Sequence, residues 1–176
     1  NNIILHTSYA AMNLNGPNNM YIYNNTFYGF NQVGGNTTKM LVQIDKPGAT
    51  DIVIKNNIFY SNANYETTPY ARCLGIASQA DHENVEADYN LYYQEDSRML
   101  LVSESGLANF FTSDFDQLQQ DWGWEQNSPD PADPLFTSDE DYHLQSSSPA
   151  IGAGISIEDI ITDFEGKYYN DPPSIG

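Results

Sequence analysis

The sequence predicts an all-β solenoid, a stack of coils made of short parallel strands, with one short helix and an irregular C-terminal cap. Three observations predict this fold. An asparagine motif recurs along the first half of the chain, short strands of alternating residues precede it, and 19 of the 176 residues are asparagine. A strand-and-turn unit that repeats at a regular spacing is typical of solenoids.

The motif places an asparagine two residues before a large side chain. The asparagines are Asn2, Asn25, Asn57 and Asn90, separated by 23, 32 and 33 residues, and the large side chains are Ile4, Phe27, Phe59 and Tyr92. Asparagine tolerates the left-handed backbone of a tight turn, and stacked amides can hydrogen bond to one another. We therefore expect a structural ladder of the four asparagines at one corner, with Phe27, Phe59 and Tyr92 stacked beside it.

Short strands fill the sequence between the motifs. Alternating segments at 20–23, 51–54 and 84–87 lead into three of the turns, and further strands are expected at 40–44, 73–77 and 99–102. Residues 1–103 are therefore predicted to form the coils. Residues 104–176 are predicted to close the same domain.

The closing module begins with a predicted helix at residues 112–122. Ser113 is the expected N-cap with Asp116 three residues on, Phe115, Leu118 and Trp122 share one face, and Gly123 ends the helix. A proline-rich loop follows at 129–134. We expect His143, Asp133 and Asp163 to act as framework residues, because polar groups near a core need hydrogen-bond partners.

The repeat resembles that of the pectate-lyase-like superfamily, whose members are right-handed parallel β-helix proteins. The resemblance is closest from residue 84 on. Four segments, Asp133–Phe136, Asp141–Leu144, Ser148–Gly154 and Asp163–Gly166, follow the order seen in the ending of many secreted bacterial β-helix proteins. Two departures are Lys167-Tyr168-Tyr169, where that ending has Arg-Pro, and the stop at Gly176. The chain also opens on a motif, so we expect it to be a piece of a longer protein.

The resemblance implies an extracellular or cell-surface protein of bacterial origin that binds or degrades a polysaccharide, as a lyase or a glycoside hydrolase. In that case this piece is mainly structural, and an active site can lie outside it. The alternative is a non-enzymatic adhesin or a rod-like fibre protein. The sequence indicates no particular oligomeric state.

The net charge of the chain excludes some classes of binding partner. The chain has 24 acidic and 6 basic residues, a net charge of −18. Nucleic acids and anionic membranes are bound through Lys and Arg, so neither is an expected partner. No apolar run approaches the ~20 residues of a membrane span, so membrane insertion is not expected. The single cysteine, Cys73, excludes an internal disulfide framework.

Two acidic side chains are the candidates for hydrolytic catalysis. Glu86 and Asp88 alternate on one strand, which places their carboxyl groups on the same face about 7 Å apart. Glycoside hydrolases use such a pair as acid and base, although two acids on a solvent-facing strand are also an ordinary soluble surface. A lyase site is less favoured, because the Lys and Arg residues do not repeat at the coil period and the net charge repels a polyuronate.

Binding residues are also predicted. Tyr21 and Tyr23 share one face of a strand and could present their rings to a sugar, although aromatic residues also favour strands in general. Asp139, Glu140 and Asp141 offer hard oxygen ligands to Ca²⁺, without the ordered spacing of an EF-hand loop. Calcium is therefore the one cofactor that the sequence suggests.

Overall fold

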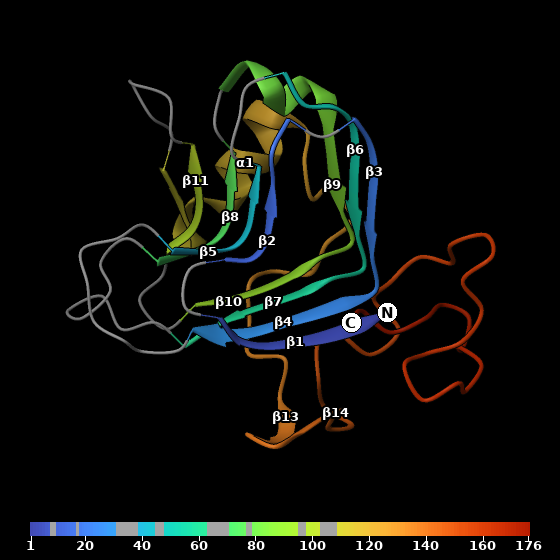
Figure 1. The fold of residues 1–176 in the computed structure, drawn as a ribbon. Coiled ribbons are helices and arrows are strands. Elements are labelled where there is room, and N and C mark those ends of the chain that lie inside the picture. Colours follow the sequence, from blue (N-terminus) through green and yellow to red (C-terminus); the bar gives the residue numbers. More distant parts are fainter. Residues whose placement is uncertain are drawn as a thin grey trace.

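A computed structural model describes residues 1–7, 10–16, 18–30, 39–44, 48–62, 71–76, 79–94, 98–102 and 109–176. Within these residues the fold is mostly β, with parallel strands stacked into three sheets and one short α-helix (Figure 1). This arrangement is compatible with the predicted parallel β-helix. The predicted boundary between coils and closing module, at residues 103 and 104, lies outside the described residues.

Each full coil contributes one strand to each sheet. Sheet A is parallel and has the order β1 (Asn2–Thr7), β4 (Asn25–Phe30), β7 (Ile58–Ser61) and β10 (Leu91–Gln94). Sheet C contains β3 (Asn18–Tyr23), β6 (Thr50–Lys55) and β9 (Val85–Asp88). Sheet B contains β2 (Ala10–Leu14), β5 (Lys39–Ile44), β8 (Ala71–Ile76) and β11 (Arg98–Val102), with β12 (Asn109–Phe111) antiparallel to β11. The three sheets form the sides of the stack (Figure 1).

The coils turn from sheet C into sheet A at a corner that needs left-handed backbone. The residues there, Asn24, Asn56 and Tyr89, have φ angles of 54°, 57° and 56°. Asparagine adopts this conformation at low cost, which explains its use at two of the three turns. The residue that follows each turn is the repeat asparagine.

The structure brings the four repeat asparagines together in one ladder. Each Nδ2 donates to the Oδ1 of the asparagine in the next coil, at 3.0 Å from Asn2 to Asn25, from Asn25 to Asn57 and from Asn57 to Asn90. The Oδ1 atoms of Asn57 and Asn90 each accept a backbone N–H as well, at 3.1 Å from Asn25 N and at 2.9 Å from Asn57 N. Asn57 and Asn90 are fully buried. The ladder therefore satisfies polar groups that would otherwise be unpaired inside the corner.

The aromatic side chains two residues on form a second stack inside the core. The ring centroids of Phe27 and Phe59 are 5.2 Å apart, and those of Phe59 and Tyr92 are 5.0 Å apart, with interplanar angles of 10° and 9°. All three rings are buried. They pack with the aliphatic side chains of sheets B and C, such as Ile44 and Ile54, in one continuous core.

The ladder ends on a buried carboxylate that the sequence analysis did not single out. Asn90 Nδ2 donates to Glu125 at 3.0 Å, the Tyr92 hydroxyl donates at 2.7 Å, and the Ser128 hydroxyl donates at 2.5 Å. Glu125 is fully buried, and its φ of 55° matches the left-handed residues of the corner. Its side chain accepts from the N–H and the Nδ2 of Asn90, which are the two contacts that Asn90 Oδ1 accepts from Asn57. Glu125 therefore supplies the last acceptor of the ladder.

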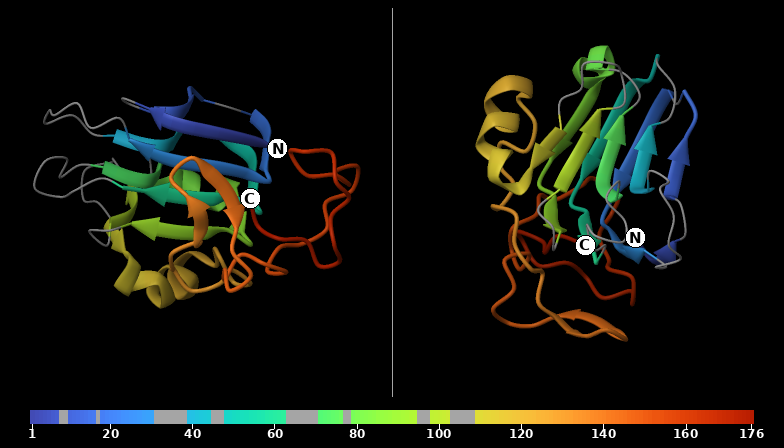
Figure 2. Two further views of the ribbon diagram at one scale, coloured as in Figure 1. Left: turned by 90° about the horizontal axis from the view of Figure 1, so that it is seen from below. Right: turned by 90° about the vertical axis from the view of Figure 1, so that its left-hand side faces the viewer.

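One end of the core is closed by the helical segment. The predicted helix is observed as a 3-10 turn, η2 (Thr112–Asp114), followed by α1 (Phe115–Trp122), which ends at Gly123 with φ of 69°. The N-cap of α1 is Asp114 rather than Ser113, and its side chain makes no capping hydrogen bond to α1. The Asp114 carboxylate instead accepts the Phe111 N–H at 3.0 Å, in a capping box at the start of η2. A second 3-10 helix, η1 (Gln79–Asn84), precedes β9. Figure 2 shows α1 at one end of the stack and the first coil at the other.

The remaining chain runs back along the outside of sheet A (Figure 2). Its antiparallel hairpin, β13 (Phe136–Ser138) and β14 (Asp141–Leu144), packs Phe136 against the outward rings of Tyr28 and Tyr60. Farther along, Ala150 and Ile175 form a small apolar cluster with Ile58 and Leu91. The two termini consequently lie close together (Figure 1).

Replacing Asn57 by Ala should destabilise the fold. The change removes the acceptor of the Asn25 N–H and one of the two acceptors of Asn25 Nδ2. It also removes the Asn57 Nδ2 donor from the carbonyls of Ile22 and Lys55 and from Asn90 Oδ1. We expect the free energy of unfolding to fall by about 3 kcal/mol, because each buried unsatisfied group costs ~1–3 kcal/mol and the corner relaxes in part. Chemical denaturation measures this free energy of unfolding. Asn84→Ala, at an exposed position, is the control, and equal losses in the two variants would contradict the ladder's role.

Glu125 should make stability depend on pH. Burial outweighs the hydrogen bonds from Ser128, Tyr92 and Asn90, and with the nearby charge of Asp88 it raises the pKa of Glu125 to about 7 from 4.5. A raised carboxyl pKa gives stability that is fully present below pH 4.5 and is lost as the pH rises through about 7. The size of the effect is about 3 kcal/mol for a shift of this order.

The matched variant is Glu125→Gln, which keeps the shape of the side chain and does not titrate. We expect the difference in unfolding free energy between the parent and this variant to change across that pH window, while the contributions of all other acids cancel. Denaturation curves at several pH values measure the difference. A difference that is constant with pH would show that Glu125 is not the responsible group.

Candidate functional site

A cavity of about 480 Å³ lies between sheet A and the returning C-terminal segment. Its floor comes from the start of β1 and β4, and its walls come from the hairpin and from the last residues of the chain. The polar and aromatic side chains that line it are Asn1, Asn2, Asn24, Thr26, Glu140, Asp141, Tyr142, His143, Asp163, Phe164, Glu165, Tyr168, Tyr169, Asn170 and Ser174. A cavity of this size is within the usual range for small-molecule sites.

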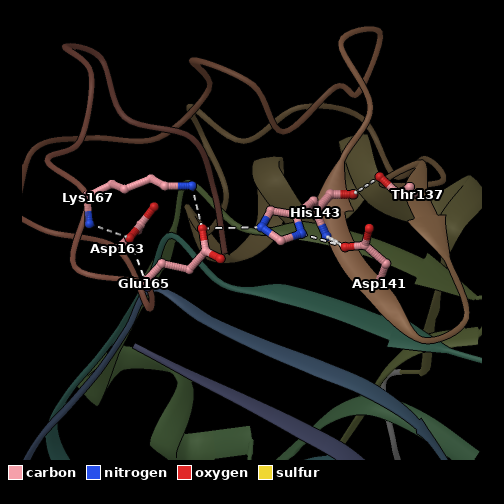
Figure 3. A network of polar contacts seen from close by, with 6 residues as sticks. All are labelled: Thr137, Asp141, His143, Asp163, Glu165 and Lys167. Atoms are coloured by element: carbon pink, nitrogen blue, oxygen red, sulfur yellow. Dashed lines mark hydrogen bonds and ion pairs between the residues drawn. The ribbon is translucent and has the colours of Figure 1, made fainter.

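One wall carries a row of alternating charges (Figure 3). The His143 Nδ1 lies 2.5 Å from Asp141 Oδ1, and its Nε2 lies 3.3 Å from Glu165 Oε2. The same Glu165 oxygen is 2.6 Å from Lys167 Nζ. The histidine is therefore held between two carboxylates, one from its own strand and one from a loop more than 20 residues away in sequence.

Local structure explains how these side chains meet. Asp141 and His143 are two residues apart on β14, so they share a face of the strand, and Thr137 Oγ1 on β13 donates to the His143 carbonyl at 3.0 Å. Asp163 Oδ1 accepts the backbone N–H groups of Glu165 and Lys167 at 2.9 and 2.8 Å. This turn presents Glu165 toward His143 (Figure 3).

The pairing shifts the pKa values of the groups in this wall. The hydrogen bonds to Asp141 and then to Glu165 raise the pKa of His143 above its usual 6.5. The hydrogen bond to His143 lowers the pKa of Asp141, and that to Lys167, followed by that to His143, lowers the pKa of Glu165. A protonated imidazole donates from both nitrogens and cannot accept a proton. These contacts favour the protonated imidazole, held between two carboxylates.

The other wall is aromatic and open to solvent. Phe164 is 66% exposed and Tyr168 is 79% exposed, which is unusual for side chains of this size. Tyr142 is anchored instead, because its ring packs edge-on against Tyr28 and its hydroxyl donates to the Asp139 carbonyl at 2.9 Å. Tyr169 donates to Asn1 Oδ1 at 3.2 Å, which ties the last residues to the first coil. The cavity therefore combines rigid contacts with free ring faces.

The predicted catalytic pair lies elsewhere, on the outer face of sheet C. Glu86 is 2.5 Å from Lys55 Nζ. Asp88 accepts the backbone N–H of Tyr89 at 2.9 Å and two bonds from Asn127, at 2.8 and 2.7 Å. Both carboxylates thus make structural contacts, and neither lines the cavity.

The predicted sugar-binding tyrosines share that face. In register, Tyr21 pairs with Val53 on β6 and Val53 pairs with Glu86 on β9, while Tyr23 pairs with Lys55 and Lys55 with Asp88. The tyrosines and the acids therefore lie on the same face but two strands apart. The rings of Tyr21 and Tyr23 are 5.8 Å apart and inclined by 43°. The structure therefore brings together the residues predicted for binding and for catalysis, but the tilted rings do not make one continuous platform.

The residues predicted for calcium divide between different contacts. Asp139 accepts the Tyr28 hydroxyl at 3.3 Å, Asp141 pairs with His143, and Glu140 lines the cavity. Among the described residues, no group of three or more His, Cys, Asp and Glu side chains is arranged to hold a metal ion. Calcium binding stays a prediction.

Sequence reasoning missed most of the cavity. It treated His143 and Asp163 as framework residues and did not select Phe164, Glu165 or Tyr168. The available signal was the dense run of charged and aromatic residues from 163 to 169. The pairing of that run with the hairpin depends on the return path of the chain, which no local pattern encodes.

Comparisons with known proteins found no matching family model, no matching curated protein and no matching solved structure. In the part of the chain that the structure describes, no helix has the length and apolar character needed to cross a membrane.

Replacing Asp141 by Asn should shift the titration of His143. The largest cause of the raised pKa is removed, so we expect the His143 pKa to move down toward 6.5. Glu165→Gln should move it in the same direction by less. NMR titration of the imidazole protons measures both shifts. Asp139→Asn, which changes a neighbouring acid that does not contact His143, is the control, and an unmoved His143 in Asp141→Asn would contradict the pairing.

Proposed function

We propose that this chain is an extracellular or cell-surface glycan-binding protein of bacterial origin, and that it binds its ligand in the cavity beside sheet A. We further propose that its coils form a right-handed parallel β-helix of the pectate-lyase-like type. The observation that carries the proposal is the combination, in one cavity, of exposed aromatic rings with a row of fixed polar groups.

Carbohydrates match this combination chemically. A sugar ring has an apolar face that stacks on aromatic side chains and a rim of hydroxyl groups that both donate and accept. Phe164 and Tyr168 offer the ring faces, while Asp141 and Glu165 offer acceptors whose positions are fixed by their ion pairs. Several asparagine side chains along the floor can both donate and accept.

The same geometry favours binding over cleavage at this cavity. A glycoside hydrolase needs two carboxyl groups about 5–9.5 Å apart with the substrate between them. Here the imidazole of His143 fills the space between Asp141 and Glu165. Removal of a proton from a uronate requires an unprotonated base, whereas the raised pKa of His143 favours its protonated form. Any enzymatic activity is therefore proposed to lie outside this cavity.

The alternative remains a rod or adhesin without a glycan site. The observation that favours it is the uninterrupted ladder, which makes the stack stiff and would suit a spacer. Under this alternative, the cavity is only a gap left where the C-terminal segment returns over sheet A. The two proposals differ in whether a soluble glycan binds.

Substitution of the free aromatic rings tests the proposal. We expect the chain to bind members of a panel of neutral and charged oligosaccharides. Phe164→Ala or Tyr168→Ala should weaken that binding about two- to tenfold, because a ring contact is worth ~0.5–1.5 kcal/mol. Both side chains are exposed, so the fold should be unaffected. Isothermal titration calorimetry gives the affinities.

The matched control is Tyr21→Ala on the outer face of sheet C, where the tyrosine is 60% exposed. Its affinity should equal that of the parent. Loss of binding in Tyr21→Ala alone would move the site to sheet C. The absence of binding to every glycan of the panel would favour the rod.

A further inference from the structure

We propose that the cavity selects glycans that carry free amino groups, such as polymers of glucosamine, over neutral glycans and polyuronates. The inference rests on the proposed function, since it names the ligand class of the same site. Three observations support it independently of the acidic composition of the chain: the cavity itself, its unused carboxylate oxygens and its exposed rings.

The lining of the cavity has an excess of negative charge. Four carboxylates line it, from Glu140, Asp141, Asp163 and Glu165, and His143 is the one basic side chain in the lining. Lys167 adds one ammonium group beside Glu165. With His143 protonated, two negative charges remain uncompensated among these six side chains. The cavity therefore attracts a cationic ligand and repels a uronate.

The contacts of these carboxylates leave oxygen atoms available. Asp141 contacts His143 through Oδ1 only. Asp163 accepts the backbone N–H groups of its turn through Oδ1. Glu165 contacts His143 and Lys167 through Oε2. In these contacts, the second carboxylate oxygen of Asp141, Asp163 and Glu165 accepts no hydrogen bond from the described residues. An ammonium group has three N–H donors and no acceptor. It can thus be bound by oxygens whose positions the ion pairs already fix.

Glu140 differs from the other three acids. It is exposed at the tip of the hairpin, and its carboxylate takes part in no ion pair among the described residues. Its negative charge is therefore not offset by a neighbouring cation. This makes Glu140 the acid whose charge should matter most to a cationic ligand and least to the fold.

The aromatic side chains of the cavity also favour a cationic ligand. A cation over the face of a Phe or Tyr ring is attracted by the ring's quadrupole. Phe164 and Tyr168 line the cavity and are largely exposed, so their rings are accessible to a ligand. A glucosamine unit carries both the apolar ring face that stacks and the ammonium that pairs. A metal ion offers only the charge, and no three-ligand group for one exists among the described residues.

The test compares three hexamers that share one β-1,4 backbone, built from glucosamine, from N-acetylglucosamine and from glucose, with a galacturonate hexamer as the anionic probe. Calorimetry at low salt and about pH 6 favours the protonated amines, because free α-amino groups titrate at ~7.7–8.0. We expect the glucosamine hexamer to bind at least tenfold more tightly than the two neutral hexamers. Added salt should weaken this preference, and the galacturonate hexamer should not bind.

Variants separate a local charge effect from general attraction to an acidic protein. Glu140→Gln should weaken binding of the glucosamine hexamer several-fold, and by more than it changes the affinity for either neutral hexamer. Glu158→Gln, which makes the same change at an exposed position outside the cavity, should leave all affinities unchanged. Thermal unfolding of both variants checks that the fold is intact.

Equal affinities for the three hexamers, or equal losses in the Glu140 and Glu158 variants, would overturn the inference and leave the proposed function in place. If neither the glucosamine nor the neutral hexamers bind, the proposed function fails with it. Binding of the neutral hexamers alone would likewise keep the glycan site and exclude the preference for amines.

Discussion

The hydrogen-bonded ladder at the corner between sheets C and A is the constraint on which the rest of the structure depends. Every amide donates in the same direction, from Asn2 through Asn90, and the series ends on the carboxylate of Glu125. Chains of aligned hydrogen bonds polarise one another, and a buried chain that ends on an unpaired group is costly. The corner therefore fixes both the register of the coils and the position of the segment that closes them.

The ladder also determines what lies on each side of sheet A. Because successive side chains alternate, the corner register sends Phe27, Phe59 and Tyr92 into the core and Tyr28 and Tyr60 outward. The outward rings then receive the hairpin through Phe136. The cavity exists because the returning segment is attached at the rings and near the first residues, and stands away from the strands between these attachments.

Much of the stack could be predicted from sequence, because its physical cause is periodic. A ladder needs the same residue type at the same place in every coil, so Asn25, Asn57 and Asn90 are visible as a repeat. Glu125 performs the same function once, in an irregular segment, and leaves no repeat to detect. The cavity was missed for a related reason, since His143 and Glu165 meet only through the path of the chain around sheet A.

The cavity joins the two extremes of the polypeptide. Its lining includes Asn1 and Asn2 from the first coil and Ser174 to Gly176 from the last residues. A molecule bound there would contact both, so it would have to leave before the terminal segment could detach. By mass action, occupancy would then raise the resistance of the whole domain to unfolding and to proteolysis of that segment. A ligand site between these two segments therefore couples the stability of the fold to ligand binding.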